Sequence, residues 1–569
     1  MSSLRLTNWL TRSLLRYSKV QQISRIQKRF YAAVDDPRVT RKNENMVYMS
    51  FKIILKYTCL REKKEYVFAR KILNTAINGL LKGLILGVYQ KEGEKDPKLT
   101  PSGEKFDDRV QGKVSELVKE CNITGTLGKG KVFNNIDQEY RSVAVIGVGR
   151  EGAGFNELEM IDDGMENVRI ATGVGARSLQ LQGCSEVFVD SMEYPEQAAE
   201  GSALAVWRYN DNKQKKNRTN VPKLELYDSP EVDAWTRGLF KAEAQNLARR
   251  LSDAPANQMT PTTFAQATVD ALCPCGVTVE IRTMDWIEQQ HLNSFLTIAK
   301  GSCEPPVLLE ISYCGTAPED KPILLLGKGM TFNSGGICLR PADGMEEYRG
   351  AMAGAAVVVA AIRASAALSL PINISAVIPL CENMPSGMAV KPGDIVTLIN
   401  GRTLAIRNTD KAGVVVMADP LLYAQNTYKP RLVVDVATLG NGVVKGLGGG
   451  ATGIFSNSHY IWKQFQKAGS LTGDRMWRLP LWRYYRQLVA DNVSFDISND
   501  GVGPASSCLA AAEFVPCVDW AHLDIRGVGM LTRYGTVPYL LKNRMTGRPT
   551  RTLIQFLYQM ACPDATPSK

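Results

Sequence analysis

Two glycine-rich segments in the second half of the chain carry the charged residues best suited to chemistry. Residues 327–336 (GKGMTFNSGG) contain Lys328, and residues 408–413 (NTDKAG) contain Asp410. A lysine in a glycine-rich turn invites a phosphate-binding interpretation, but this segment lacks the spacing and the Lys-Ser/Thr ending of a phosphate loop. The glycines at 147 and 149 are too few for a dinucleotide fingerprint. Neither pattern therefore indicates nucleotide chemistry.

Zinc chemistry of the finger or ribbon kind is also poorly supported. The chain has three histidines, His291, His459 and His522, and one close cysteine pair, Cys273 and Cys275. Structural zinc sites use two such pairs, or one pair with closely spaced histidines. We therefore interpret the cysteine pair as structural.

Several further motifs follow one another in a fixed order. They are residues 246–251 (NLARRL), 255–257 (PAN), 381–387 (CENMPSG), 391–394 (KPGD) and 545–551 (MTGRPTR). Together with the two glycine-rich segments, this series closely resembles the leucine aminopeptidase family of the cytosol-aminopeptidase type. The resemblance runs from about residue 80 to about residue 560.

This resemblance implies both a fold and a reaction. The implied fold is a two-domain α/β subunit with a smaller N-terminal domain and a larger C-terminal domain, whose sheet is mixed and mostly parallel. Six such subunits assemble as two stacked trimers in the family. The implied reaction is release of N-terminal residues from peptides by two zinc or manganese ions about 4 Å apart, which polarise the carbonyl and generate a hydroxide. The family's metal ligands are one lysine, three aspartates and one glutamate, and a second lysine and an arginine assist catalysis.

The residues that match these seven positions mostly depart from the family's types. The five metal-ligand positions are Lys328, Asn333, Ala351, Asp410 and Ala412, and the two catalytic positions are Arg340 and Val414. Only the lysine ligand and one aspartate ligand keep their type. The substrate pocket departs too, because Tyr348 replaces a methionine, and the strand end at Thr438 and Leu439 has a changed sequence.

The charges that are left do not suit a metal pair. Lys328, Arg340 and Asp410 sum to +1 before any ion binds, so a divalent cation would meet two cations and one carboxylate. Arginine also differs from lysine in shape and reach, and its planar fork matches a carboxylate. We therefore expect no metal cofactor, and we expect Asp410 to pair with Arg340 or Lys328 as a structural residue.

Nearby acids offer the opposing interpretation, in which the lost ligands are replaced. The candidates are Asp343, Glu346, Glu347, Asp394 and Asp419. The first three lie in a polar, loop-like segment typical of solvated residues, and Asp394 lies in a Pro-Gly-Asp turn, where side chains bond locally. If these acids did bind metal, two zinc or manganese ions would be expected in each subunit.

Alternating strands and helices must position these residues. Apolar, β-branched runs predict strands near residues 80–89, 142–147, 186–189, 321–326, 372–379 and 431–437. Helical spacing predicts helices at 166–181, 229–252 and 351–368, the last too apolar to lie outside the core. Polar composition predicts loops at 91–110 and 207–223. We expect an N-terminal α/β domain at 45–228, a connecting helix at 229–252 and a C-terminal aminopeptidase-like domain at 253–562.

The N-terminal segment has the composition of a mitochondrial transit peptide. Residues 1–34 carry seven basic residues and no acid, with Arg5, Arg12 and Arg16 on one helical face. Without these seven charges the net charge falls from +11 to +4, because 61 basic residues then face 57 acidic ones. The nearly balanced remainder argues against a nucleic-acid partner.

We therefore expect a leucine aminopeptidase homologue that has lost catalysis and acts as a structural, oligomer-forming mitochondrial protein. It resembles the sperm leucyl aminopeptidases of insects, which implies a component of the sperm tail or its modified mitochondria. A homo-hexamer or a mixed hexamer with paralogues is expected, with no membrane span. The alternatives are an active dinuclear aminopeptidase and a module that binds peptide termini without cleaving them.

Overall fold

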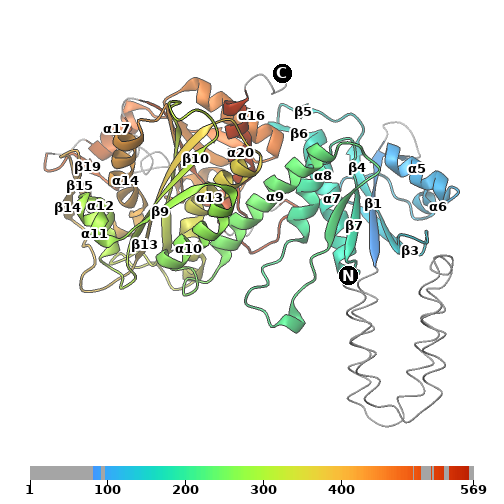
Figure 1. Cartoon of the computed structure of the whole chain (residues 1–569), viewed down its shortest axis with the longest axis horizontal. Coiled ribbons are helices and arrows are strands. Elements are labelled where there is room, and N and C mark those ends of the chain that lie inside the picture. The colour runs from blue at the N-terminus through green and yellow to red at the C-terminus, as the bar shows by residue number, and fades with distance from the viewer. Residues whose placement is uncertain are drawn as a thin grey trace, which may run out of the picture. The chain divides into compact units, whose positions relative to one another are not determined.

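The computed structural model describes residues 81–90, 97–490, 493–500, 514–515, 518–530 and 537–562. The expected transit segment at 1–34 and the first part of the expected N-terminal domain, residues 45–80, lie outside the described residues. Both predicted α/β units are present in the described part of the chain (Figure 1). Each is a sheet covered by helices, and they are called the N-terminal layer and the second layer.

The N-terminal layer is built on a sheet in the order β3-β4-β1-β7-β8. Its strands are β1 (Lys82–Gln90), β3 (Gly130–Asn134), β4 (Ser142–Arg150), β7 (Glu186–Asp190) and β8 (Lys223–Tyr227). β1 runs parallel to β4 and β7, and the short β2 (Lys98–Leu99) pairs with it antiparallel. The central strands β1 and β4 are buried on both faces because helices cover both faces of the sheet.

Two helix pairs cover this sheet. On one face lie α5 (Pro101–Arg109) and α6 (Lys113–Glu120), and on the other lie α7 (Asp163–Leu181) and α8 (Pro195–Val206). The predicted loop at 91–110 is therefore wrong in its second half. Thr100 caps α5 by accepting a hydrogen bond from the Gly103 amide, and Pro101 opens the helix. Polar composition concealed a capped amphipathic helix that buries Phe106.

The long helix α9 (Val232–Asp253) leads to the second layer and matches the predicted connecting helix. The second sheet has the order β18-β17-β20-β16-β11-β13-β10-β9, with β12 beside β13. Its strands are β9 (Thr278–Arg282), β10 (Val307–Cys314), β11 (Ile323–Gly327), β12 (Gly329–Asn333), β13 (Asn373–Asn383), β16 (Leu432–Ala437), β17 (Thr452–Ser456), β18 (Met476–Arg478) and β20 (Asp519–Asp524). The central strands are parallel and the flanking pairs of β9, β10 and β17 are antiparallel, so the expected mixed, mostly parallel sheet is confirmed.

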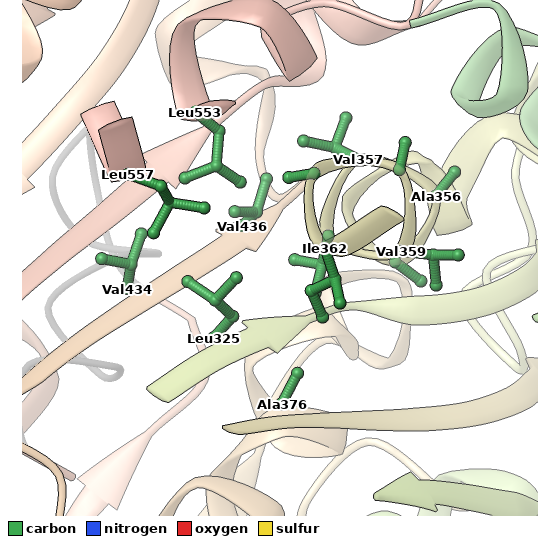
Figure 2. Packing of buried hydrophobic residues seen from close by; sticks show 14 of the residues in the cluster. Leu325, Ala356, Val357, Val359, Ile362, Ala376, Val434, Val436, Leu553 and Leu557 are labelled. Carbon is green, nitrogen blue, oxygen red and sulfur yellow. The ribbon is translucent and has the colours of Figure 1, made fainter. Parts of the chain in front are cut away.

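The core of this layer is formed around α13 (Ala353–Ala367), which lies on the sheet and is buried along almost its whole length (Figure 2). Val357, Val359 and Ile362 of α13 belong to one apolar cluster with Leu325 of β11 and Val434 of β16. The segment Met345–Ala367 is long and apolar enough to span a membrane, but 83% of its most apolar 18-residue window is buried inside the protein. The sequence-based interpretation of a buried core helix is therefore confirmed.

The remaining helices complete the second layer around this core, and the remaining turns and small strands are distributed over both layers. The helices are α10 (Pro261–Leu272), α11 (Met284–Gln289), α12 (Asn293–Ala299), α14 (Gly413–Tyr428), α15 (Asn441–Leu447), α16 (His459–Thr472), α17 (Arg483–Ala490), α19 (Arg526–Gly529) and α20 (Thr550–Ala561). Short 3-10 turns are η1 (Lys215–Asn217), η2 (Cys273–Cys275), η3 (Met345–Met352) and η4 (Thr409–Lys411), and small strands are β5 (Phe155–Asn156), β6 (Ile161–Asp162), β14 (Asp394–Thr397), β15 (Thr403–Ile406) and β19 (Ile497–Ser498). α12 and α14 belong to the apolar cluster on the face opposite α13.

A buried network of charges joins the two layers. Glu200 of α8 accepts hydrogen bonds from Arg169 of α7 at 2.6 Å and from Arg551 of α20 at 2.7 Å. All three side chains are at most 1% exposed. Arg551 also donates to Gln245 of α9 at 2.7 Å, so the network links the N-terminal layer, the connecting helix and the C-terminal helix.

Candidate functional site

The carboxyl ends of the central parallel strands carry the residues that the sequence pointed to. Lys328 follows β11, Asn333 ends β12, and Thr438 follows β16. η3 and η4 bring Tyr348 and Asp410 to the same edge. In an open parallel sheet this edge is where ligand sites form, because the polar strand ends and loops converge there.

Lys328 is held as a buried hydrogen-bond donor. Its side chain is 2% exposed, and its Nζ donates to the Thr438 carbonyl at 2.8 Å and to Thr438 Oγ1 at 3.1 Å. Burial, together with the nearby charges of Arg340 and Arg526 and against those of Asp524 and Asp410, lowers the pKa of this amine to about 7. Gly413 lets α14 begin beside it, since a Cβ there would lie 3.0 Å from Lys328 Cε.

Arg340 and Asp410 form an ion pair, as expected from the sequence. The arginine side chain is 8% exposed and the aspartate 29%. The Arg340 guanidinium also lies 3.6 Å from the centre of the Tyr348 ring, a cation–π contact. Burial lowers the pKa of Arg340, which Asp410 opposes. The carboxylate that matches a metal-ligand position is thus engaged by a cation of the protein itself.

Tyr348 also contacts a second arginine, Arg526, which the sequence motifs did not identify. Arg526, the first residue of α19, donates to Tyr348 Oη at 3.0 Å and to the Leu439 carbonyl at 2.9 Å. It follows the buried Asp524 at the carboxyl end of β20, and burial raises the pKa of that aspartate. An aspartate that ends a buried strand, followed two residues later by an arginine, was the signal available in the sequence.

Asn333 is satisfied entirely by the protein. Its Oδ1 accepts from the Gly335 amide at 2.9 Å and from Asn383 Nδ2 at 2.8 Å, and its Nδ2 donates to the Asp410 carbonyl at 3.3 Å. Asn383, also missed at first, ends β13 in the CENMPSG motif and donates to the Thr409 carbonyl at 2.9 Å. The side-chain amides of Asn333 and Asn383 therefore link the ends of β12 and β13 to η4.

The other three matched positions are apolar and buried. Ala351, Ala412 and Val414 belong to one apolar cluster and are at most 3% exposed. The only polar group of Ala351 that bonds in the site is its carbonyl, which accepts from Thr438 Oγ1 at 2.8 Å. These positions extend the hydrophobic core up to the site and supply no side-chain ligand.

The alternative acids do not converge on this site. Asp343 and Glu346 are exposed, and Asp394 accepts from the Lys391 amide at 2.9 Å within its own turn. Asp419 is fully buried in α14, where it accepts from the amides of Ser294 at 2.7 Å and Ile399 at 3.0 Å. Among the described residues no group of three His, Cys, Asp or Glu side chains is arranged to hold a metal ion.

The residues present therefore do not fit a pair of divalent metals. The amine donates to two acceptors, the carboxylate is paired with Arg340, and the Asn333 oxygen already accepts two N–H groups. The Lys328 amine and two arginines, Arg340 and Arg526, neighbour the two carboxylates Asp410 and Asp524, so the carboxylates leave no surplus negative charge to hold a dication. A dication would have to displace an arginine and would find no bridging carboxylate.

Comparisons with known proteins agree on one family. The profile of the cytosol aminopeptidase family catalytic domain matches residues 246–554, and that of its N-terminal domain matches residues 85–216. A protein of Homo sapiens named cytosol aminopeptidase is 44% identical over 509 residues, covering 88% of this chain and 96% of that protein. The protein of the same name from Bos taurus is 44% identical over 497 residues, covering 85% and 94%.

Solved structures give the same result at the level of the fold. The bottromycin maturation enzyme BotP in complex with Mn superposes with a TM-score of 0.71 at 27% identity, covering 85% of this chain and 100% of that one. The two-domain architecture is therefore shared along the whole length of that enzyme.

Proposed function

The chain belongs to the cytosol aminopeptidase family, and we propose that it is a member that keeps the fold, does not cleave peptides and acts as an oligomer-forming structural protein. The observation that carries this proposal is the ion pair of Arg340 with Asp410. The one aspartate retained among the matched ligand positions serves there as the counter-charge of an arginine.

Two further features support the loss of catalysis. Hydrolysis by a dinuclear centre needs bridging carboxylates that neutralise two dications, and Ala351 and Ala412 supply none. Val414 also provides no hydrogen-bond donor for a reacting oxygen or for an anion that shuttles protons. Restoring one ligand, as in Asn333→Asp, would still leave both alanines, so this variant should remain inactive.

An active dinuclear aminopeptidase is the second candidate function, and the comparisons favour it. Relatives that are 43–44% identical over about 85% of this chain are named cytosol aminopeptidase. The same level of identity is compatible with our proposal, because seven positions are a small part of the aligned length. The two candidates differ in metal content and in hydrolysis, which are directly measurable.

The test is metal content and peptidase activity of the recombinant chain from Ala32 onward, because the sequence Arg29-Phe-Tyr-Ala32 resembles a transit-peptide cleavage site after Tyr31. After incubation with zinc or manganese and removal of free ions, we expect much less than one ion per chain by elemental analysis. Hydrolysis of leucyl anilides should stay at the level of a buffer blank. The bovine cytosol aminopeptidase, prepared identically, is the positive control. Two retained ions per chain together with hydrolysis would establish the active enzyme instead.

We also propose that the chain assembles as a homo-hexamer, or as a mixed hexamer with paralogues, in mitochondria or in the sperm-tail structures derived from them. The native mass from light scattering tests the assembly. Because the contacts around the site are made by the protein itself, assembly should not change when a chelator is added. A monomer at micromolar concentration would contradict a structural role that depends on oligomers.

A further inference from the structure

Three arginines gather at the carboxyl end of α8, far along the chain from the residues of the candidate site. Arg249 of α9 is fully buried and donates to the Leu204 carbonyl at 2.9 Å. Arg208 donates to the carbonyls of Ala205 and Trp207, both at 2.8 Å. Arg177 of α7 donates to the Leu540 carbonyl at 3.3 Å. The partners of all three guanidinium groups among these contacts are neutral carbonyls.

The arginines are close enough to repel one another. Burial, opposed by the charge of Asp253 and aided by the charges of Arg177 and Arg208, lowers the pKa of Arg249 to about 9. Burial and the charge of Arg177 likewise lower the pKa of Arg208. The Arg249 guanidinium lies 4.1 Å from the centre of the Trp207 ring, which places it directly beside the residue that precedes Arg208.

The two carboxylates close to this cluster form ion pairs with other arginines. Asp253 acts on Arg249 only at a distance, and it pairs with Arg349 at 2.8 Å and with Arg544 at 3.6 Å. Asp211 pairs with Arg250 at 2.9 Å. The end of a helix supplies only about half a negative charge, which is less than three guanidinium groups need. Asp253 therefore offsets Arg249 only in part, and among the described residues no carboxylate forms an ion pair with Arg177, Arg208 or Arg249.

Buried polar atoms without partners lie in the same place. Among the described residues, the Nε donors of Arg177 and Arg249 are buried and make no hydrogen bond, and neither do the buried acceptors Gln180 Oε1 and Asp253 Oδ2. Gln180 is fixed beside the cluster, because its Nε2 donates to the carbonyls of Val206 and Asn220, both at 2.8 Å. Buried donors that lack acceptors are costly unless a ligand or solvent satisfies them.

The loop that leaves α8 adds positive charge beside the cluster. Residues 207–223 contain six basic residues and one acid, Asp211. The loop is closed on itself by Asn210, which donates to the Thr219 carbonyl at 2.9 Å, and it carries η1 away from the helices (Figure 1). Such a loop raises the local concentration of anions.

We propose that Arg177, Arg208 and Arg249 form a binding site for a phosphate group, either inorganic phosphate or the phosphate of a small phosphomonoester. A dianion of this size balances most of the charge. Its oxygens also suit planar guanidinium groups, which recognise phosphate through paired N–H donors. Arg177 and Arg208 are half-exposed, so they give the ligand access from solvent, while the buried Arg249 forms the base.

The test is thermal unfolding and calorimetry of the recombinant chain with inorganic phosphate and, separately, with phenyl phosphate. Ionic strength is held constant with sodium chloride. Phosphate should raise the melting temperature in a saturable way that chloride does not reproduce. Tighter binding of phenyl phosphate would identify a phosphomonoester as the ligand, and tighter binding of phosphate would identify the free ion.

Variants locate the site. Arg177→Gln and Arg208→Gln should each weaken phosphate binding about tenfold, the loss expected for one charged hydrogen bond. In buffer free of phosphate, Arg177→Gln should melt higher than the wild type, because it removes repulsion. Arg250→Gln, on the same helix but paired with Asp211, is the matched control and should bind as the wild type does.

Three outcomes would overturn the proposal. The first is an equal effect of chloride, which would show general screening alone. The second is unchanged binding in both cluster variants. The third is no response of the wild type to either probe, which would mean that the charge is balanced from another source, such as a carboxylate of a second copy of this chain.

Discussion

At the scale of single residues, the polar side chains at positions that match the family's metal ligands make contacts within the protein instead. The sequence predicted the pairing of Asp410 because an arginine and one surviving carboxylate stood at matched positions. The partner of Lys328 was not predicted, because the acceptor is a backbone carbonyl, which no side-chain pattern reveals. Arg526 was missed because it lies outside the quoted motifs and reaches the site only through the packing of β20 beside β16.

The first prediction concerns the Arg340–Asp410 pair. Asp410→Ala should leave the Arg340 guanidinium nearly buried and unpaired, and it should destabilise the protein by about 2 kcal/mol. This is less than a fully buried pair would cost, since Asp410 is partly exposed. Chemical unfolding monitored by fluorescence measures the change.

The double variant Asp410→Ala/Arg340→Met is the matched control for that measurement. It removes both charges, so it should recover most of the lost stability. If Asp410→Ala unfolds at the same denaturant concentration as the wild type, the pair has no structural role.

The second prediction is a pH dependence caused by Lys328. The pKa of this amine is near 10.5 in the unfolded chain and about 7 in the folded protein. Between these values the unfolded state binds the extra proton, so the free energy of unfolding should rise with pH, by up to about 1.4 kcal/mol per unit. Below pH 7 the full penalty of the buried charge is present.

Lys328→Met tests this assignment, since it keeps the length of the side chain and removes the titration. The slope of the melting temperature between pH 7.5 and 9.5 should be smaller in the variant than in the wild type. Equal slopes would show that Lys328 is not the titrating group.

At the scale of elements, apolar runs predicted the central strands well and polar runs predicted loops poorly. β4, β7, β11, β13 and β16 all lie where apolar residues cluster, because strands covered on both faces bury most of their side chains. α5 was missed because its short buried face, Ser102, Gly103, Phe106 and Asp107, contains a single large apolar residue. The capping pattern of Thr100 and Pro101 was the signal that composition concealed.

The third prediction concerns the network that joins α7, α8 and α20. Burial raises the pKa of Glu200, but the charges of Arg169, Arg551 and Lys241 outweigh burial and lower this pKa to about 2. Glu200→Gln should leave both guanidinium groups without their shared counter-charge and cost about 3–5 kcal/mol. Urea unfolding should show a lower midpoint. Glu225→Gln, which breaks an exposed pair with Lys223, should leave the midpoint unchanged.

At the scale of the whole molecule, charge is distributed unevenly, and each part of it has a separate explanation. Seven of the positive charges fall within residues 1–34, which carry no acid, and the rest of the chain is nearly balanced. Within that remainder, one concentration lies at the end of α8 and another at the strand ends of the second sheet. Sequence alone located the first of these three regions, because it is contiguous. The other two form only when distant elements pack together.

The last prediction follows from the contiguous region. We propose that residues 1–34 direct the chain into mitochondria, because the membrane potential draws an acid-free, arginine-rich segment inward. A fluorescent protein carrying residues 1–34 should therefore enter mitochondria in cells. Replacing Arg5, Arg12 and Arg16 with glutamate should abolish import, whereas replacing the same three residues with lysine should preserve it. Import of the glutamate variant would mean that positive charge does not drive the targeting, and the proposed location would then have no support.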